Sequence, residues 1–112
     1  MKKLIIENLN EIIYTVKLDS GFQIFLYPTK KSKNFYITLT TNFGAKVTSY
    51  KKNNKNIEVI PGTAHFLEHK VMNLNNALGK ELETLGTMPN AYTSYMGTTY
   101  NLYGHKNIKR NI

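Results

Sequence analysis

The sequence contains no cysteine, only one arginine and few acidic residues. Without cysteine the chain can form neither a disulfide framework nor a thiolate metal site, so a bound metal would need histidine and carboxylate ligands. No apolar run approaches the ~20 residues that a membrane-spanning helix requires. The N-terminus starts with basic residues, but Glu7 and Asn8 interrupt its apolar stretch before it resembles a signal peptide. We therefore expect a cytoplasmic protein with no membrane partner.

The lysines give this chain of 112 residues a net charge of +8, which raises the question of a nucleic-acid partner. They cluster at positions 30, 31 and 33 and again at positions 51, 52 and 55, among asparagine and serine residues. Sequence-specific interfaces use arginine side chains and recognisable modules, whereas Arg110 is the only arginine here and no such module is present. We interpret the clusters as solvated loop lysines, without a specific nucleic-acid partner. A nonspecific attraction to acidic partners would weaken with added salt.

Alternating apolar and polar residues predict β-strands in the first part of the chain. Residues 14–27 predict a hairpin, because the alternation continues on both sides of a turn at residues 19–21. A third strand is predicted from Phe35 to Leu39, running towards Gly44. With 41% hydrophobic residues, the chain can form one modest core.

The middle and end of the chain predict a loop, two helices and further strands. Residues 45–60 are rich in lysine and asparagine and predict a polar loop. Thr63 is a suitable N-cap for a helix over residues 63–72, and a second helix is predicted within residues 75–85. The remainder predicts one or two strands around Gly97. This order predicts an α+β fold in one domain, residues 1–112, with a mainly antiparallel sheet and helices packed on one of its faces.

Two of the three histidines lie four residues apart in the segment AHFLEHKVM, residues 64–72. On a helix, at about 100° per residue, Glu68 lies about 60° to one side of His65 and His69 about 40° to the other. The three side chains therefore share one face, while Phe66 and Leu67 point away from it and can enter the core. Two imidazoles at this spacing can bind one Zn²⁺, and the carboxylate can serve as general base towards a metal-activated water. A polar helix face that carries these residues by coincidence is the alternative.

The segment PGTAHFLEHKVM resembles the inverted His-x-x-Glu-His motif of the pitrilysin/insulinase-type zinc metallopeptidases, or inverzincins. Two further segments resemble the family in the same order along the chain. LDSGFQIFLYP is similar to its opening hairpin, and ELETLGTMPNAYTSYMGTTYNLYG is similar to the helix, turn and strand that follow the metal helix. Lys70, directly after the motif, resembles the bacterial members of the family.

The resemblance implies a role for each matching residue. His65 and His69 would be zinc ligands and Glu68 the general base of a zinc-dependent endopeptidase. Asn90 and Ala91 would lie on a strand that holds an extended peptide substrate through main-chain hydrogen bonds. An ordinary strand start explains these two residues equally well.

The resemblance also implies that the site is incomplete in this sequence. The family's third zinc ligand is a glutamate on a helix farther along the chain than any residue present here. The chain is then a truncated N-terminal catalytic domain, and the rest of that domain and the family's second, similarly folded half are absent. Glu81, Glu83 and His105 could in principle replace the missing ligand, but each is expected to be a surface residue.

Two function classes follow from these observations. The first is a zinc metallopeptidase whose 112-residue chain is weakly active or inactive alone, acting on peptides or unfolded polypeptides. The alternative is a non-catalytic module that binds peptides or a subunit through its sheet edge. Uncovered strands invite pairing, so either class predicts self-association or a complementing subunit that supplies the missing glutamate.

Overall fold

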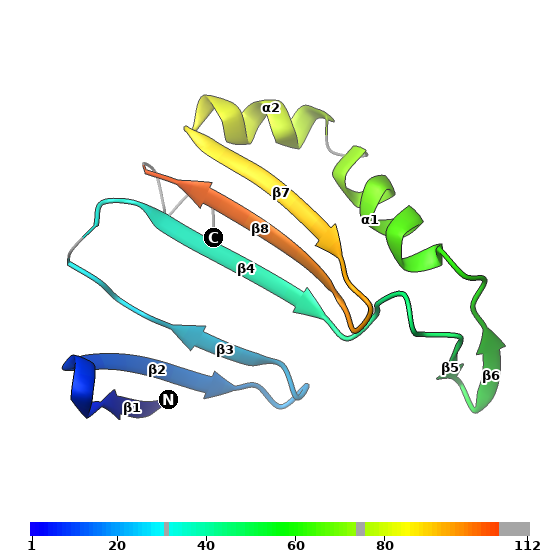
Figure 1. The fold of residues 1–112 in the computed structure, drawn as a ribbon, viewed down its shortest axis with the longest axis horizontal. Coiled ribbons are helices and arrows are strands. Elements are labelled where there is room, and N and C mark those ends of the chain that lie inside the picture. The colour runs from blue at the N-terminus through cyan, green and yellow to red at the C-terminus, as the bar shows by residue number, and fades with distance from the viewer. Residues whose placement is uncertain (31, 74–75, 106–112) are drawn as a thin grey trace. The chain divides into compact units, whose positions relative to one another are not determined.

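The computed structural model describes residues 1–30, 32–73 and 76–105, and its chain divides into two compact units, Met1–Ser32 and Lys33–Ile112 (Figure 1). Each strand pairing in the described residues is antiparallel, and the two α-helices belong to the second unit. The α+β class expected from the sequence is therefore confirmed. The described strands form three small sheets, not one. No helix in the described residues is long and apolar enough to cross a membrane.

The first unit is a three-stranded sheet. It contains β1 (Lys2–Ile6), a 3₁₀ turn (Glu7–Leu9), β2 (Glu11–Lys17) and β3 (Gln23–Leu26), in the order β1-β2-β3. The predicted hairpin is confirmed as β2 and β3. A hydrogen bond from the Tyr27 hydroxyl to the Glu11 carboxylate also links these strands, and it raises the pKa of Tyr27. Strand β1 was not predicted, because its apolar run does not alternate with polar residues.

The second unit contains the sheet that positions the candidate site. Its strands are β4 (Phe35–Thr41), β7 (Thr87–Thr93) and β8 (Thr98–Gly104), with β8 in the centre and β7 at one edge. The predicted third strand and the strand pair around Gly97 are thus confirmed. Directly paired residues lie on the same face, so Thr93 shares a face with Thr98.

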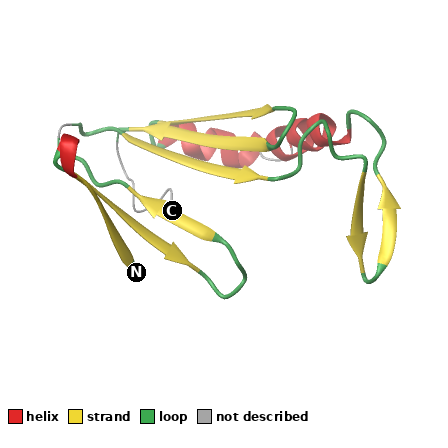
Figure 2. Ribbon diagram, turned by 60° about the horizontal axis from the view of Figure 1, so that its bottom comes forward, coloured by secondary structure: helices red, strands yellow, loops and turns green. Residues whose placement is uncertain are grey.

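Two helices lie along β7 on one side of this sheet (Figure 2). They are α1 (Thr63–Asn73) and α2 (Asn76–Thr84), close to the two predicted ranges. Gly86 follows α2 with φ of 73°, a left-handed conformation that suits glycine at a helix end. Thr63 does not serve as the predicted N-cap. It is the first helical residue, and its hydroxyl donates to the Ile60 carbonyl at 2.6 Å.

The orientation of α1 differs from the sequence-based expectation. Ala64 and Glu68, one turn apart, are buried at 5% and 7% exposure, whereas Phe66 and Leu67 are 59% and 44% exposed. The expectation that Phe66 and Leu67 enter the core is therefore wrong. The Ala64–Glu68 stripe faces inward instead, and Glu68 accepts a hydrogen bond there from Thr93 of the sheet. Outside the core, Phe66 packs beneath a lysine ammonium on the same helix.

The segment predicted as a polar loop contains a second hairpin. It consists of β5 (Ser49–Lys52) and β6 (Lys55–Glu58), which pair in antiparallel register (Figure 1). Asn53 and Asn54 form its two-residue turn with φ of 51° and 60°. Two consecutive positive φ values match the twist of a hairpin, and asparagine adopts them readily. The lysine and asparagine content, poor in β propensity, concealed these strands.

The loop after β4 meets the turn between β7 and β8 at two glycines, Gly44 and Gly97. Ala45 and Lys46 donate backbone hydrogen bonds to the carbonyls of Ser94 and Tyr95, each at 3.0 Å. A Cβ atom added at Gly97 would collide with the Thr41 carbonyl oxygen. Only glycine therefore permits this close approach of backbone to backbone.

Replacing Gly97 with alanine is expected to reduce the free energy of unfolding by about 3 kcal/mol or more, because a backbone oxygen cannot move aside as a side chain can. Gly21 is the matched control, since an added Cβ meets nothing within 4 Å there. Its positive φ of 87° should limit the loss to about 1 kcal/mol on replacement with alanine. Urea denaturation followed by circular dichroism measures both. Equal losses for the two variants would contradict the close contact at Gly97.

Candidate metal centre on helix α1

The structure brings His65, Glu68 and His69 together on one turn of α1. The Nε2 atoms of the two histidines face each other at 3.0 Å, with ring centroids 4.5 Å apart and ring planes at 84°. The Nδ1 atom of His65 lies 3.5 Å from Oε2 of Glu68. Both imidazoles are exposed and the carboxylate is buried. The exposed imidazole nitrogens thus lie beside the buried carboxylate of Glu68.

The facing nitrogens fit a shared zinc ion. Two nitrogens each 2.0–2.1 Å from a tetrahedral Zn²⁺ lie about 3.3 Å from each other, close to the spacing of the two Nε2 atoms. The Nδ1 atom of His65 faces Glu68, so a proton on Nδ1 leaves Nε2 with its lone pair available as a ligand. The donor set, two neutral imidazoles with a carboxylate beside them, is of the type that zinc prefers.

Glu68 is fixed by a hydroxyl from the sheet. The Oγ1 atom of Thr93 on β7 donates to Oε2 of Glu68 at 2.8 Å. Thr98 lies beside Thr93, with 3.3 Å between their hydroxyl oxygens, and donates its own hydrogen to the Phe43 carbonyl at 2.8 Å. Since each hydroxyl has one hydrogen, the contact between the two threonines is close packing rather than a further hydrogen bond. Thr93 is therefore the residue that holds the carboxylate in place.

Sequence reasoning did not assign a role to Thr93 or to Tyr100. Thr93 belongs to the Asn-Ala-x-Thr segment that resembles the family, and its placement near the motif helix could have been suspected from that alone. Tyr100 on β8 carries no local sequence signal. Burial raises its pKa, and the negative charge of Glu68 raises it further. Thr93 is linked to the motif by its hydrogen bond to Glu68, and Tyr100 by the effect of the Glu68 charge on its pKa.

The pKa of Tyr100 offers a direct test of this arrangement. Replacing Glu68 with glutamine should lower that pKa towards the ordinary tyrosine value, because the nearby negative charge is lost. It should stay above that value, because burial is the larger cause and remains. The titration can be followed by NMR of tyrosine labelled with ¹³C at Cζ, in metal-free protein. A pKa of Tyr100 that does not change in the variant would contradict the proximity of the two groups.

Asn90 and Ala91, the predicted substrate-binding residues, lie on the edge strand β7. The Ser94 N–H donates to the Gly97 carbonyl at 2.8 Å, which makes that pair hydrogen-bonded across the hairpin. Hydrogen-bonded and non-bonded pairs alternate along an antiparallel ladder, so the amide and carbonyl of Ala91 point out to the free edge. The Oδ1 atom of Asn90 accepts a hydrogen bond from this amide at 2.9 Å. The edge position expected for the pair is present, and the Asn90 side chain occupies its donor.

Pro89 has the same outward orientation as Ala91, two residues before it on β7, and offers no N–H to the free edge. Proline on an edge strand limits pairing with other chains. From Pro89 to Ala91 the free edge of β7 therefore presents two carbonyl groups and one amide donor, the N–H of Ala91.

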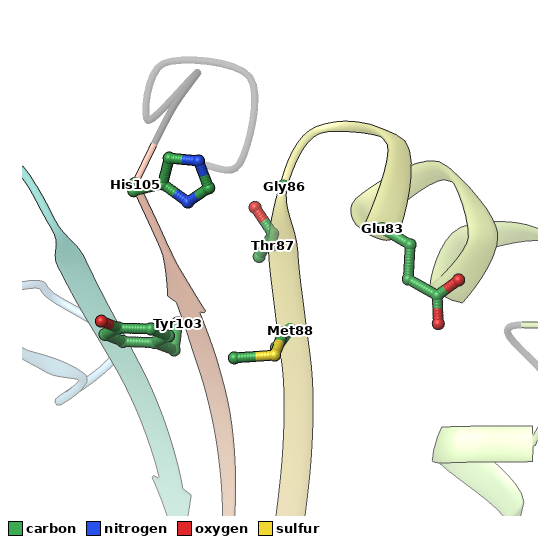
Figure 3. A pocket seen from close by; sticks show the side chains of 6 residues that line it. All are labelled: Glu83, Gly86, Thr87, Met88, Tyr103 and His105. Atoms are coloured by element: carbon green, nitrogen blue, oxygen red, sulfur yellow. The ribbon is translucent and has the colours of Figure 1, made fainter.

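The residues considered as replacements for a third ligand lie apart from the histidine pair. Glu81 is an exposed residue on α2. Glu83 and His105 line a separate hollow of about 250 Å³, and in Figure 3 the Glu83 carboxylate points away from the His105 ring. Its other lining residues are Gly86, Thr87, Met88 and Tyr103. Within residues 1–30, 32–73 and 76–105, no group of three or more His, Asp and Glu side chains could hold a metal ion.

Comparison with known proteins gives one relative by sequence and one by structure, and no family model matches the chain. The zinc protease YmfH of Bacillus subtilis (strain 168) is 30% identical over 115 residues, covering 100% of this chain and 27% of the relative. A crystal structure of an M16-like peptidase from Alicyclobacillus acidocaldarius matches 86% of this chain with a TM-score of 0.78 and 26% sequence identity.

The chain spans about a quarter of the length of each relative, 27% of one and 23% of the other. The sequence similarity extends over the whole chain, and the structural similarity over most of it. Together with the fold, these two findings confirm the resemblance seen in the sequence. The chain is similar in sequence to part of a zinc protease and in fold to part of an M16-like peptidase.

Proposed function

We propose that this chain contributes the metal-binding pair and the general base of a zinc-dependent endopeptidase. The observation that carries the proposal is the convergence of the His65 and His69 Nε2 atoms beside a buried carboxylate, Glu68. The name of the Bacillus subtilis relative, a zinc protease, supports the same metal and the same reaction class. When bound, zinc supplies Lewis-acid chemistry, which polarises a peptide carbonyl and makes water more acidic.

Each residue of the centre has a distinct part in this proposal. His65 and His69 hold the ion through Nε2. Glu68 accepts a proton from the attacking water on a carboxylate oxygen and later returns it to the leaving amine. Thr93 keeps the carboxylate in position through the hydrogen bond to Oε2, so the base does not have to be ordered during the reaction.

The edge of β7 supplies a place for an extended peptide. The outward amide and carbonyl of Ala91 can pair with one residue of a substrate strand, as in other strand-addition complexes. The Oδ1 atom of Asn90 accepts from this amide at 2.9 Å and must release it first. Asn90 therefore controls whether the edge donor is available. The substrates expected are peptides and unfolded polypeptides, since only these offer a free backbone strand.

The proposed centre needs one more ligand. Catalytic zinc sites in proteins have three protein ligands, and the described residues bring two histidines together. The third is proposed to be a glutamate that is not among these 112 residues and that a further stretch of chain or a complementing polypeptide supplies. Hydrolysis by this chain alone is then weak.

The experiment that tests the proposal is hydrolysis of an internally quenched peptide mixture by the zinc-loaded chain, compared with its Glu68→Gln variant. Hydrolysis by the parent alone supports the endopeptidase. Equal rates would exclude Glu68 as the base. The second candidate, a non-catalytic peptide-binding module, is favoured by the free edge of β7. It requires that neither the parent nor Glu68→Gln hydrolyses the peptides, and that both bind them.

A further inference from the structure

A second hollow lies beside α1, on the side away from the histidine pair. Leu67, which lines it, lies about 160° around the helix from both His65 and His69. It has a volume of about 400 Å³ and is lined by Phe43, Tyr50 and Leu67. These residues come from the loop after β4, from β5 and from α1. Each contributes an apolar or aromatic side chain, and Leu67 and Tyr50 are each 44% exposed. The hollow is therefore open to solvent and large enough for one bulky apolar side chain.

The β5–β6 hairpin continues this hollow with a positively charged face. Side chains two residues apart on a strand lie on the same face, so Lys52 shares the face of Tyr50. Lys52 pairs directly with Lys55, and Tyr50 pairs with Ile57. The two lysines therefore stand on the same hairpin face as Tyr50, two cross-strand pairs farther towards the turn.

The carboxylate of the hairpin lies on its other face. Glu58 pairs with Ser49, and Lys51 pairs with Asn56, and both pairs occupy the face opposite to Tyr50. In the described part of the chain, Lys52 and Lys55 form no ion pair. Like charges directly opposite each other destabilise a strand pair. An anionic partner between them would remove this repulsion, which gives the face a preference for negative charge.

We propose that the hollow and the two lysines form a docking site for an acidic peptide segment that carries one bulky apolar residue. The apolar side chain enters the hollow between Phe43, Tyr50 and Leu67, and carboxylates two or three residues away reach Lys52 and Lys55. A peptide fits both parts, whereas a nucleic acid would use the lysines and leave the aliphatic wall at Leu67 without a function. The site goes beyond the proposed hydrolysis and does not require it.

The test is equilibrium binding of a fluorescein-labelled peptide, Gly-Asp-Glu-Phe-Asp-Glu-Gly, to the full chain in EDTA, where no zinc-dependent cleavage occurs. Lys52→Ala and Lys55→Ala are each expected to weaken binding by up to about fivefold, as exposed charge pairs do. Lys51→Ala is the matched control, because it removes the same charge from the neighbouring residue on the opposite face. It should change the affinity less than twofold.

The peptide itself supplies the second comparison. Replacing its phenylalanine with glycine should weaken binding at least tenfold, because the buried aromatic surface is lost. Equal effects of Lys51→Ala and Lys52→Ala would overturn the proposal, as would an unchanged affinity for the glycine peptide. Displacement of the labelled peptide by an equal concentration of a ten-nucleotide oligothymidylate would overturn it in favour of nucleic acid. Unaltered thermal melts of the variants ensure that the comparison is between folded proteins.

Discussion

Replacing Glu68 with glutamine is expected to lower kcat/KM for peptide hydrolysis by about 10²–10⁴-fold, the contribution of a positioned general base. Glutamine has nearly the same shape, and its amide oxygen can still accept the hydrogen bond that Thr93 donates at 2.8 Å. It cannot take a proton from water at neutral pH. The fold and the zinc content should therefore stay the same while the reaction is lost.

A second variant separates the base from its support. Thr93→Val removes the hydroxyl and keeps the β-branched shape, so Glu68 retains its charge and loses its anchor. A loss smaller than that of Glu68→Gln is expected, with an altered dependence of the rate on pH. If Glu68→Gln loses its zinc as well as its hydrolysis, the carboxylate is needed for metal binding. That result would contradict its role as a base.

Exchange of both His65 and His69 for alanine is expected to weaken zinc binding more than 100-fold. Mutation of groups that only support a ligand already costs about 10–100-fold in affinity, and loss of the ligands themselves should cost more. The measurement is the zinc content of the chain after dialysis against a defined free zinc concentration. Near-stoichiometric zinc in the parent would also indicate that a third ligand, from this chain or from another copy, completes the centre.

The chain offers its own control for this experiment. His105 packs against Gly86 at a separate hollow, and a Cβ on that glycine would lie 3.2 Å from its ring. His105→Ala removes an imidazole without touching the α1 pair, so its zinc content should equal that of the parent. Equal zinc in the parent and in the double variant would show that α1 does not hold the metal, and the peptide-binding alternative would take its place.

Much of this arrangement could be predicted from the sequence because its signals are local. The three-residue and four-residue spacings of His65, Glu68 and His69 determine a shared helix face wherever a helix forms. The threonine and tyrosine content around Gly97 likewise predicts one or two strands, which the structure shows as β7 and β8. These signals need no knowledge of what packs against them, and the structure places the elements where they were expected.

The parts that could not be predicted depend on tertiary contacts or on backbone conformation. Phe66 is apolar and lies exposed, because the buried stripe of α1 carries Ala64 and Glu68, and Glu68 accepts a hydrogen bond there from Thr93. The β5–β6 hairpin depends on left-handed conformations at Asn53 and Asn54, in a segment whose composition indicates a loop. In each case a polar residue adopts a particular hydrogen bond or backbone conformation that the average secondary-structure propensity of its segment does not predict.

The meeting of the Gly44 and Gly97 loops has a consequence for how the length of this chain can vary. The two backbone bonds there join residues 45 and 46 to residues 94 and 95, so residues 47–93 form an excursion with fixed ends. Each doubling of a flexible loop's length costs only about 0.6 kcal/mol. Residues can therefore be added to or removed from the tip of the lysine hairpin during evolution while both anchors remain in register. The helix that carries the two histidines and the strand that carries Thr93 lie outside this hairpin, so a change in its length leaves the bond between Glu68 and Thr93 intact.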